Sequence, residues 1–139
     1  MKSLKPILLV EDDSVDAMTV KRALKDLKVK NELVHTLNGE EALNYLQGVN
    51  GNKPCVILLD LNMPKMNGIE FLKIAKADDS MRMIPVIVLT TSREEQDKVE
   101  SFGLSAAGYI VKPTDYKKFV DTIKTIDLYW TLSELPNGG

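Results

Sequence analysis

Four clusters of polar residues each stand at the end of a short apolar run of this chain. In chain order they are Glu11-Asp12-Asp13, Asp60, Thr90-Thr91-Ser92 and Lys112-Pro113. A carboxylate such as Asp60, at the carboxyl end of a buried strand, would lie at the mouth of a crevice, where open parallel sheets bind ligands. Taken alone, an Asp after an apolar run is more often only a turn residue. The other three clusters favour a functional role for Asp60.

The acidic residues indicate a cation site. Carboxylates of Glu11, Asp12 and Asp60 would repel one another if the fold brought them together, because two unit charges about 4 Å apart cost on the order of 4 kcal/mol at an effective dielectric near 20. A divalent cation relieves that repulsion. Since only oxygen ligands are offered, the sequence predicts Mg²⁺, with Mn²⁺ as an alternative. The single histidine, His35, is expected to be a packed or edge residue of a strand rather than a ligand.

A cation beside an aspartate also indicates a chemistry. The Asp60 carboxylate is a competent nucleophile toward phosphorus, and the resulting aspartyl phosphate needs its charge neutralised. A cation held by Asp12 and Asp60 would contact one phosphoryl oxygen. The Lys112 ammonium would contact a second oxygen and the Thr90 hydroxyl a third. Considered by itself Lys112 is more often a surface lysine, but Lys followed by Pro113 at a strand end is less common, and a cis peptide there would fix the lysine's approach.

The order of elements explains how distant clusters meet. Five runs rich in Val, Ile and Leu alternate with longer segments of helical periodicity, and the runs are Ile7 to Val10, Glu32 to His35, Cys55 to Leu59, Val86 to Leu89 and Tyr109 to Val111. This alternation predicts an α/β fold, with a doubly wound five-stranded parallel sheet and helices on both faces. Because parallel strands point their carboxyl ends to one edge, the four clusters are expected to converge there.

Helix starts and faces are also predicted. A small polar residue followed three positions later by Glu marks a helix start, as in the pairs Asn38/Glu41, Asn67/Glu70 and Ser92/Glu95. In the first helix we expect an inward stripe of Val15, Met18, Ala23 and Leu27, with Lys21, Arg22, Lys25 and Asp26 facing water. In the last helix the packing stripe is Tyr116, Phe119, Val120, Ile123, Ile126 and Trp130.

Length and charge narrow the class of protein. The 139 residues predict one domain over 1–139, with a core over about 6–126 and a helical extension and tail over 127–139. A net charge of −2 without a basic tail argues against direct binding of nucleic acid or an anionic membrane. We find no secretory signal and no long apolar span, and the single Cys55 falls in a predicted buried strand. The chain is therefore expected to be cytoplasmic.

Four motifs resemble the receiver domain of two-component response regulators over about residues 6–126. They are Leu8-Leu9-Val10-Glu11-Asp12-Asp13, Leu58-Leu59-Asp60-Leu61-Asn62-Met63-Pro64-Lys65-Met66-Asn67-Gly68, Pro85-Val86-Ile87-Val88-Leu89-Thr90 and Gly108-Tyr109-Ile110-Val111-Lys112-Pro113. The resemblance implies the flavodoxin-like strand order 2-1-3-4-5. It makes Asp60 the phosphoacceptor and Lys112 the lysine that pairs with the phosphate. Glu11 and Asp12 would position Mg²⁺ with Asp60, and the backbone carbonyl of Asn62 would be a further ligand.

The resemblance also implies a switch and a partner. Thr90 would be the hydroxyl that turns inward on phosphorylation, and Tyr109 the aromatic residue whose rotamer follows it. The phosphodonor would be a sensor histidine kinase, and the chain would catalyse only its own phosphorylation and dephosphorylation. One departure is Glu11, which stands where many receiver domains have Asp, so that its longer arm would reach the ion through water. With about a dozen residues after Ile126, output is expected to come from a surface change.

The end of the last predicted helix indicates a second interaction. Apolar residues fall on more than one of its faces, at Leu128, Tyr129, Trp130 and Leu132. This pattern favours a homodimer through the C-terminal helix region, the alternative being a segment folded back over the core. Tyr129-Trp130 and the Leu135-Pro136 ending are also similar to single-domain regulators that serve bacterial and cyanobacterial phytochrome kinases.

Three other classes of function remain as alternatives. Phosphatases of the haloacid dehalogenase class also use an Asp nucleophile, but they need a second acid two residues later, where this chain has Asn62. A flavin carrier would need a phosphate-binding loop after the first strand, and Glu11-Asp12-Asp13 carries the wrong charge for one. A receiver locked in one state would be an adaptor only, which the presence of Asp60, Thr90 and Lys112 disfavours.

Overall fold

The fold is a five-stranded parallel sheet between two layers of helices. The computed structural model describes residues 5–48, 53–61, 66–90, 93–104, 106–111 and 116–124. Its strands pair in the order β2-β1-β3-β4-β5. Their bounds are Ile7–Val10 for β1, Leu33–Thr36 for β2, Val56–Asp60 for β3, Val86–Thr90 for β4 and Gly108–Val111 for β5. The predicted class and strand order are confirmed.

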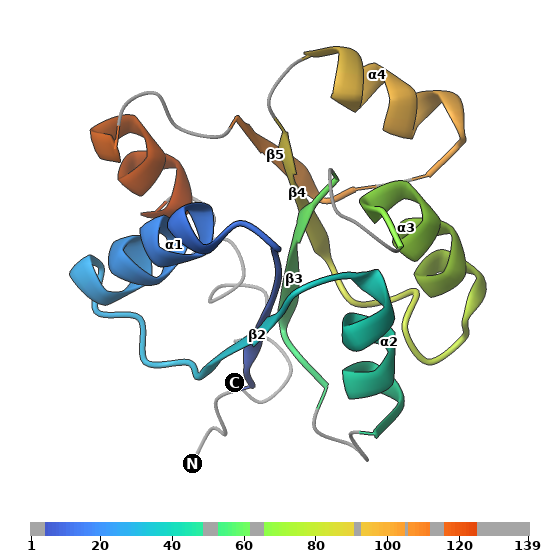
Figure 1. Ribbon diagram of the computed structural model, residues 1–139, viewed down its shortest axis with the longest axis horizontal. Helices are drawn as coiled ribbons and strands as arrows, with labels where there is room; N and C mark the ends of the chain where they lie inside the picture. Colours follow the sequence, from blue (N-terminus) through green and yellow to red (C-terminus); the bar gives the residue numbers. More distant parts are fainter. Residues whose placement is uncertain are drawn as a thin grey trace, which may run out of the picture.

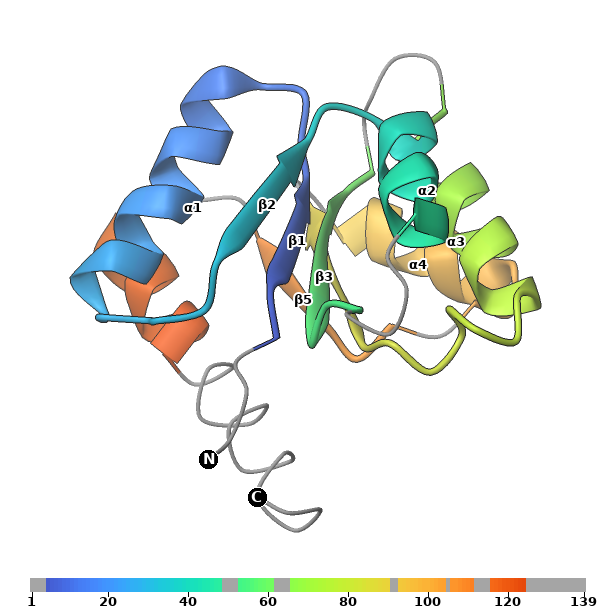
Figure 2. The ribbon, with the colours of Figure 1, turned by 90° about the horizontal axis from the view of Figure 1, so that it is seen from below.

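Helices cover both faces of the sheet. Their bounds are Ser14–Asp26 for α1, Gly39–Gly48 for α2, Gly68–Ala77 for α3 and Arg93–Ser101 for α4, and residues 116–124 are also helical. Figure 1 and Figure 2 show α1 and the 116–124 helix on one face of the sheet, with α2, α3 and α4 on the other. Among the described helices, none combines the length and apolarity needed to cross a bilayer.

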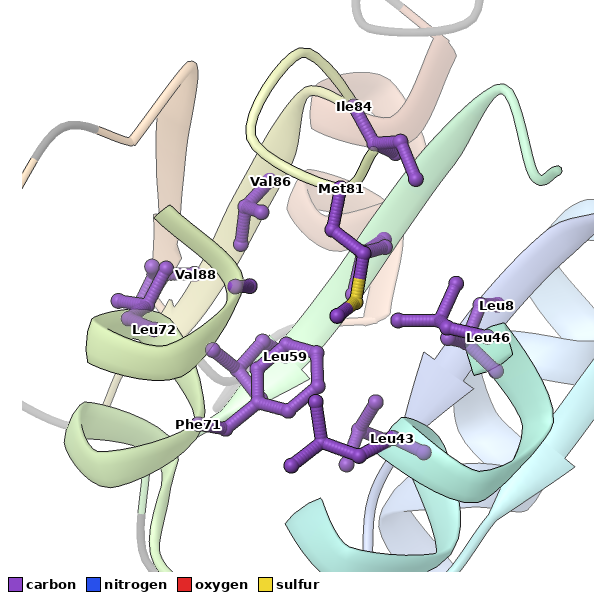
Figure 3. Close-up of a cluster of buried hydrophobic side chains, with 14 of the residues drawn as sticks. Leu8, Leu43, Leu46, Leu59, Phe71, Leu72, Met81, Ile84, Val86 and Val88 are labelled. Atoms are coloured by element: carbon purple, nitrogen blue, oxygen red, sulfur yellow. The ribbon is translucent and has the colours of Figure 1, made fainter. Parts of the chain in front are cut away.

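Two cores form because strand side chains alternate between the faces. In β3, Ile57 and Leu59 join the core under α2 and α3, whereas Val56 and Leu58 join the core under α1 and the 116–124 helix. Figure 3 shows the first of these cores, in which Phe71 of α3 is fully buried. Every residue of the central strands β1, β3 and β4 is buried, as continuous apolar runs in a parallel sheet require.

The predicted inward face of α1 is wrong at two positions. Val15 and Met18 are 68% and 67% exposed. The buried residues of the helix are Ala17, Val20, Ala23 and Leu24, so Ala23 alone of the predicted stripe is fully buried, with Leu27 packed at the margin of the core. Small alanines occupy the face that lies close to the sheet, and they gave a weaker hydrophobic signal than Val15 and Met18.

The helix starts follow the predicted capping chemistry in part. At α3, Asn67 Oδ1 accepts from the Glu70 N–H at 3.0 Å, and Glu70 Oε1 accepts from the Asn67 N–H at 3.2 Å, which confirms that capping box. At α2, Asn38 Oδ1 accepts from the Glu41 N–H at 2.9 Å, but the Glu41 carboxylate accepts from the N–H of Leu37 instead. The third pair includes Ser92, which lies outside the described residues.

The described part of the last helix packs on the sheet as its apolar stripe predicts. Phe119 and Ile123 are buried, and Tyr116 and Val120 pack beside them, which confirms the described part of that stripe. Cys55 precedes β3 and is only half-buried, so its predicted place inside a buried strand is wrong. Residues 125–139, which hold the rest of the stripe and the predicted dimer segment, lie outside the described residues.

A lysine ends α1 in a conformation that favours glycine. Lys28 has φ of 59°, and the N–H groups of Lys28 and Val29 donate to the carbonyls of Lys25 and Leu24, the two bonds of a Schellman motif. Since a side chain is strained in this region, we expect Lys28→Gly to raise the free energy of unfolding by about 0.5–1 kcal/mol. Urea denaturation of the metal-free protein measures this. Lys30→Gly, at an exposed position without a positive φ, is the control and should not stabilise.

Candidate functional site

Three carboxylates meet at the carboxyl edge of the sheet. Glu11 and Asp12 follow β1, and Asp60 is the last residue of the neighbouring strand β3. Each offers an oxygen that lies within 4.8 Å of the oxygens of the other two. The sequence prediction that these acids converge is therefore confirmed. Asn62 and Lys112, which the sequence also assigns to this site, lie outside the described residues.

The three acids differ in their exposure to water. Glu11 and Asp60 are 0% and 1% exposed, whereas Asp12 is exposed at the mouth of the site. Negative charges held this close together repel one another, and Glu11 and Asp60 are also shielded from water. A cation reverses both penalties. A donor set of carboxylate oxygens, with one acid open to solvent, fits a hard ion such as Mg²⁺ or Mn²⁺.

Several hydrogen bonds hold the loop that carries the acidic pair. The Glu11 N–H continues the ladder by donating to the Thr36 carbonyl at 3.0 Å. Asp13, which the sequence analysis did not identify as a cap, is the N-cap of α1 and accepts from two N–H groups at 2.9 Å. Its own N–H donates to Glu11 Oε2 at 3.2 Å. His35 lies half-buried on the edge strand β2, where the sequence placed it.

A glycine allows the start of α3 to approach Asp60. A Cβ atom added at Gly68 would lie 2.7 Å from the Asp60 carbonyl oxygen and 2.7 Å from Leu61 Cα. The Gly68 N–H donates to the Leu61 carbonyl at 3.0 Å, which draws the two backbones together. The sequence analysis missed this supporting role. The available signal was the Gly directly after the cap Asn67. Glycine destabilises a helix relative to alanine, so a glycine there indicates that another backbone passes close by.

Thr90 brings a buried hydroxyl to the same edge. It ends β4, the strand beside β3, and is 0% exposed. Its Oγ1 atom has no hydrogen-bond partner among the residues that the structure describes. A buried hydroxyl without a partner is unfavourable, so Thr90 offers an unused hydrogen-bond donor at the carboxyl edge of the sheet.

Replacing this hydroxyl by a methyl group tests whether the hydroxyl contributes to the stability of the unphosphorylated protein. We expect Thr90→Val to leave the unphosphorylated protein equally stable or to stabilise it by roughly 1 kcal/mol, because no described hydrogen bond is lost. Thermal or urea unfolding of the metal-free protein measures the change. Thr36→Val is the matched control: its Oγ1 donates to the Leu9 carbonyl at 3.3 Å, and its loss should destabilise. A clear destabilisation by Thr90→Val would contradict the assignment of an unused hydroxyl.

Tyr109 lies on the strand next to Thr90. Tyr109 pairs in register with Val88 of β4, two residues before Thr90, so both side chains belong to the same face of the sheet. The tyrosine is half-buried against the core that contains Val99 of α4. Burial raises the pKa of its hydroxyl, and the Glu100 carboxylate raises that pKa further. The ring therefore remains neutral and in contact with the helix layer.

Comparison with known proteins agrees with this geometry. The family model described as Response regulator receiver domain matches residues 7–124. The response regulator Rcp1 of Synechocystis sp. is 37% identical over 130 residues, which cover 91% of this chain and 88% of Rcp1. The solved Mn(2+)-bound form of Rcp1 covers 91% of this chain and 94% of its own, with 36% identity and a TM-score of 0.77.

Two further solved structures are response regulators of phytochromes. The phosphorylated cyanobacterial phytochrome response regulator RcpA is 37% identical, with a TM-score of 0.81 and coverage of 93% of this chain and 95% of its own. The bacteriophytochrome response regulator RtBRR is 43% identical, with a TM-score of 0.78 and coverage of 88% and 77%. With its parallel sheet and its acidic cluster at the carboxyl edge, the chain belongs to the response regulator receiver domain family of two-component signalling.

Proposed function

We propose that this receiver accepts a phosphoryl group on Asp60 from a sensor histidine kinase, in a reaction that depends on Mg²⁺. The observation that carries the proposal is the position of Asp60, which is 1% exposed at the end of β3 with oxygens of Glu11 and Asp12 within 4.8 Å. A carboxylate oxygen of Asp60 attacks phosphorus, and the bond from phosphorus to the donor's leaving nitrogen breaks. The product is a mixed anhydride on Asp60 and a phosphoryl-free donor.

The acidic residues would hold the cation. Receiver domains bind Mg²⁺, and the donor set of Glu11, Asp12 and Asp60 fits that ion. We assign the backbone carbonyl of Asn62 as a further ligand. When bound, the ion neutralises negative charge on the phosphoryl oxygens. Burial of Asp60 and of its neighbour Glu11 restricts the orientation of the Asp60 oxygen that attacks phosphorus.

Two residues would respond to the phosphoryl group. Lys112 pairs its ammonium with one phosphoryl oxygen. Thr90 donates its buried hydroxyl to another, a step supported by the absence of a described partner for Oγ1. Movement of Thr90 changes the space beside Tyr109, since the two side chains lie on one face of the sheet. The equilibrium between two arrangements of the surface formed by α4, β5 and the 116–124 helix then shifts.

Partners are proposed from the relatives and from the sequence. Receiver domains of phytochrome response regulators act with histidine kinases, and RcpA and RtBRR, at 37% and 43% identity, make a phytochrome kinase our candidate donor. Leu128, Tyr129, Trp130 and Leu132 support a homodimer through the C-terminal region. A molar mass from light scattering that stays that of a monomer at high concentration, with and without phosphorylation, would count against the dimer.

A phosphorylation assay tests the proposed chemistry. The purified chain is incubated with acetyl phosphate and MgCl₂, and its intact mass is measured. We expect the mass of one phosphoryl group to be added, to be lost in hydroxylamine and to be absent when EDTA replaces MgCl₂. Borohydride reduction followed by peptide mapping should place the modification at Asp60. Labelling that persists in EDTA, or that maps to a different residue, would overturn the proposal.

A further inference from the structure

His35 reaches from β2 to the loop that carries the acidic pair. Its Nε2 atom lies 2.7 Å from the backbone carbonyl oxygen of Glu11. A carbonyl oxygen only accepts hydrogen bonds, so Nε2 carries a proton and donates it. The imidazole is half-buried on the edge strand of the sheet, where reduced access of water strengthens the bond.

The carbonyl that His35 holds belongs to the peptide unit between Glu11 and Asp12. A peptide unit is planar, so the direction of its C=O also sets how the chain leaves both residues. The neighbouring hydrogen bonds do not involve this carbonyl. The Glu11 N–H donates to the Thr36 carbonyl at 3.0 Å, and the Asp13 N–H donates to the Glu11 carboxylate at 3.2 Å. The imidazole is therefore well placed to fix the one peptide unit that joins two acids of the cluster.

We propose that His35 is a positioning residue for the carboxylates of Glu11 and Asp12. The inference rests on the proposed function, in which these carboxylates hold the cation. Without the imidazole donor the Glu11 carbonyl turns toward water, because the adjoining Asp12 is exposed to solvent. The two carboxylates then spend less time in the arrangement that binds metal. Groups that orient metal ligands in this way contribute 10- to 100-fold in affinity, so we expect a loss of about 10-fold without His35.

Three variants test the proposal by Mg²⁺ titration calorimetry at one fixed pH. His35→Leu removes the donor and keeps a side chain that packs on the edge strand, and it should weaken Mg²⁺ binding about 10-fold. His35→Gln places an amide N–H near the position of Nε2 and should restore most of the affinity. Val34→Ala is the control, because this half-buried neighbour packs against the opposite core and has no described contact with the loop. It should leave Mg²⁺ affinity unchanged.

A second measurement uses the metal-free protein. In ¹H–¹⁵N spectra of the imidazole, recorded at a pH where the ring is neutral, His35 should be the Nε2–H tautomer. The Nδ1–H tautomer would overturn the proposal, as would a His35→Leu variant with the parental affinity or equal losses in the Leu and Gln variants. In those cases the parent still binds Mg²⁺ and takes phosphate on Asp60, so the proposed function stands. A parent that binds no Mg²⁺ overturns both.

Discussion

Asp60→Asn is expected to abolish phosphoryl incorporation while it makes the metal-free protein more stable. An amide nitrogen or oxygen cannot form the anhydride at phosphorus, so labelling by acetyl phosphate should fall to background. Stability should rise although labelling is lost, because Asp60 is 1% exposed and lies beside two other acids. Removing one charge from that cluster relieves repulsion and desolvation, and we expect about 1–3 kcal/mol of added stability.

The two outcomes are measured on the same samples. Intact mass after treatment with acetyl phosphate reports labelling, and urea denaturation in EDTA reports the free energy of unfolding. Asp79→Asn is the control, since it removes one charge from an exposed loop before β4, at the opposite edge of the sheet. Its ion pair with Arg82, at 3.5 Å, is a surface pair of little value, so labelling and stability should both stay near the parent. Undiminished labelling of Asp60→Asn would sink the phosphoacceptor assignment.

Gly68→Ala is expected to weaken both the fold and the site. The added Cβ would lie 2.7 Å from the Asp60 carbonyl oxygen and from Leu61 Cα, which are backbone atoms that cannot rotate away. The start of α3 must move from the end of β3, at a cost of about 1–3 kcal/mol. Because the displaced backbone carries Asp60, the rate of labelling by acetyl phosphate should also fall.

A second glycine provides the matched control for this substitution. A Cβ at Gly48, the last residue of α2, meets nothing within 4 Å. Gly48→Ala should therefore be neutral or slightly stabilising, since alanine is favoured over glycine in a helix. Urea denaturation and the initial rate of labelling are compared for both variants. Equal stability of the two would show that α3 moves from Asp60 without cost and would contradict the close approach.

Several features of the fold could be predicted from the sequence because they depend on residues close together along the chain. Alternation of apolar runs with helical segments predicted the parallel sheet, since a strand followed by a helix returns to a parallel neighbour. The capping box of Asn67 and Glu70 was readable for the same reason, because its two hydrogen bonds join residues three positions apart. Convergence of the acids followed from sheet geometry, which sends all carboxyl ends to one edge.

Other features depended on contacts between distant segments. The inward face of α1 was misjudged at Val15 and Met18 because helical periodicity sets the spacing of a stripe but not which of two overlapping stripes meets the sheet. Cys55 was misplaced by one residue, because the first residue of β3 is set by pairing with β1 and β4. Neither outcome could be resolved without the positions of the neighbouring elements.

The amino-acid sequence by itself determined the class of fold, the three acids and the identity of Asp60 as the residue to test. These follow from local patterns and from the fixed direction of parallel strands. Only the tertiary structure decided that Gly68 has no room for a Cβ atom and that His35 Nε2 lies 2.7 Å from the Glu11 carbonyl oxygen. Both are contacts with backbone atoms, which every residue carries. Even where the glycine after the cap Asn67 gave a signal, the sequence did not say which backbone lies close to it. Three-dimensional packing alone selects which backbone comes close.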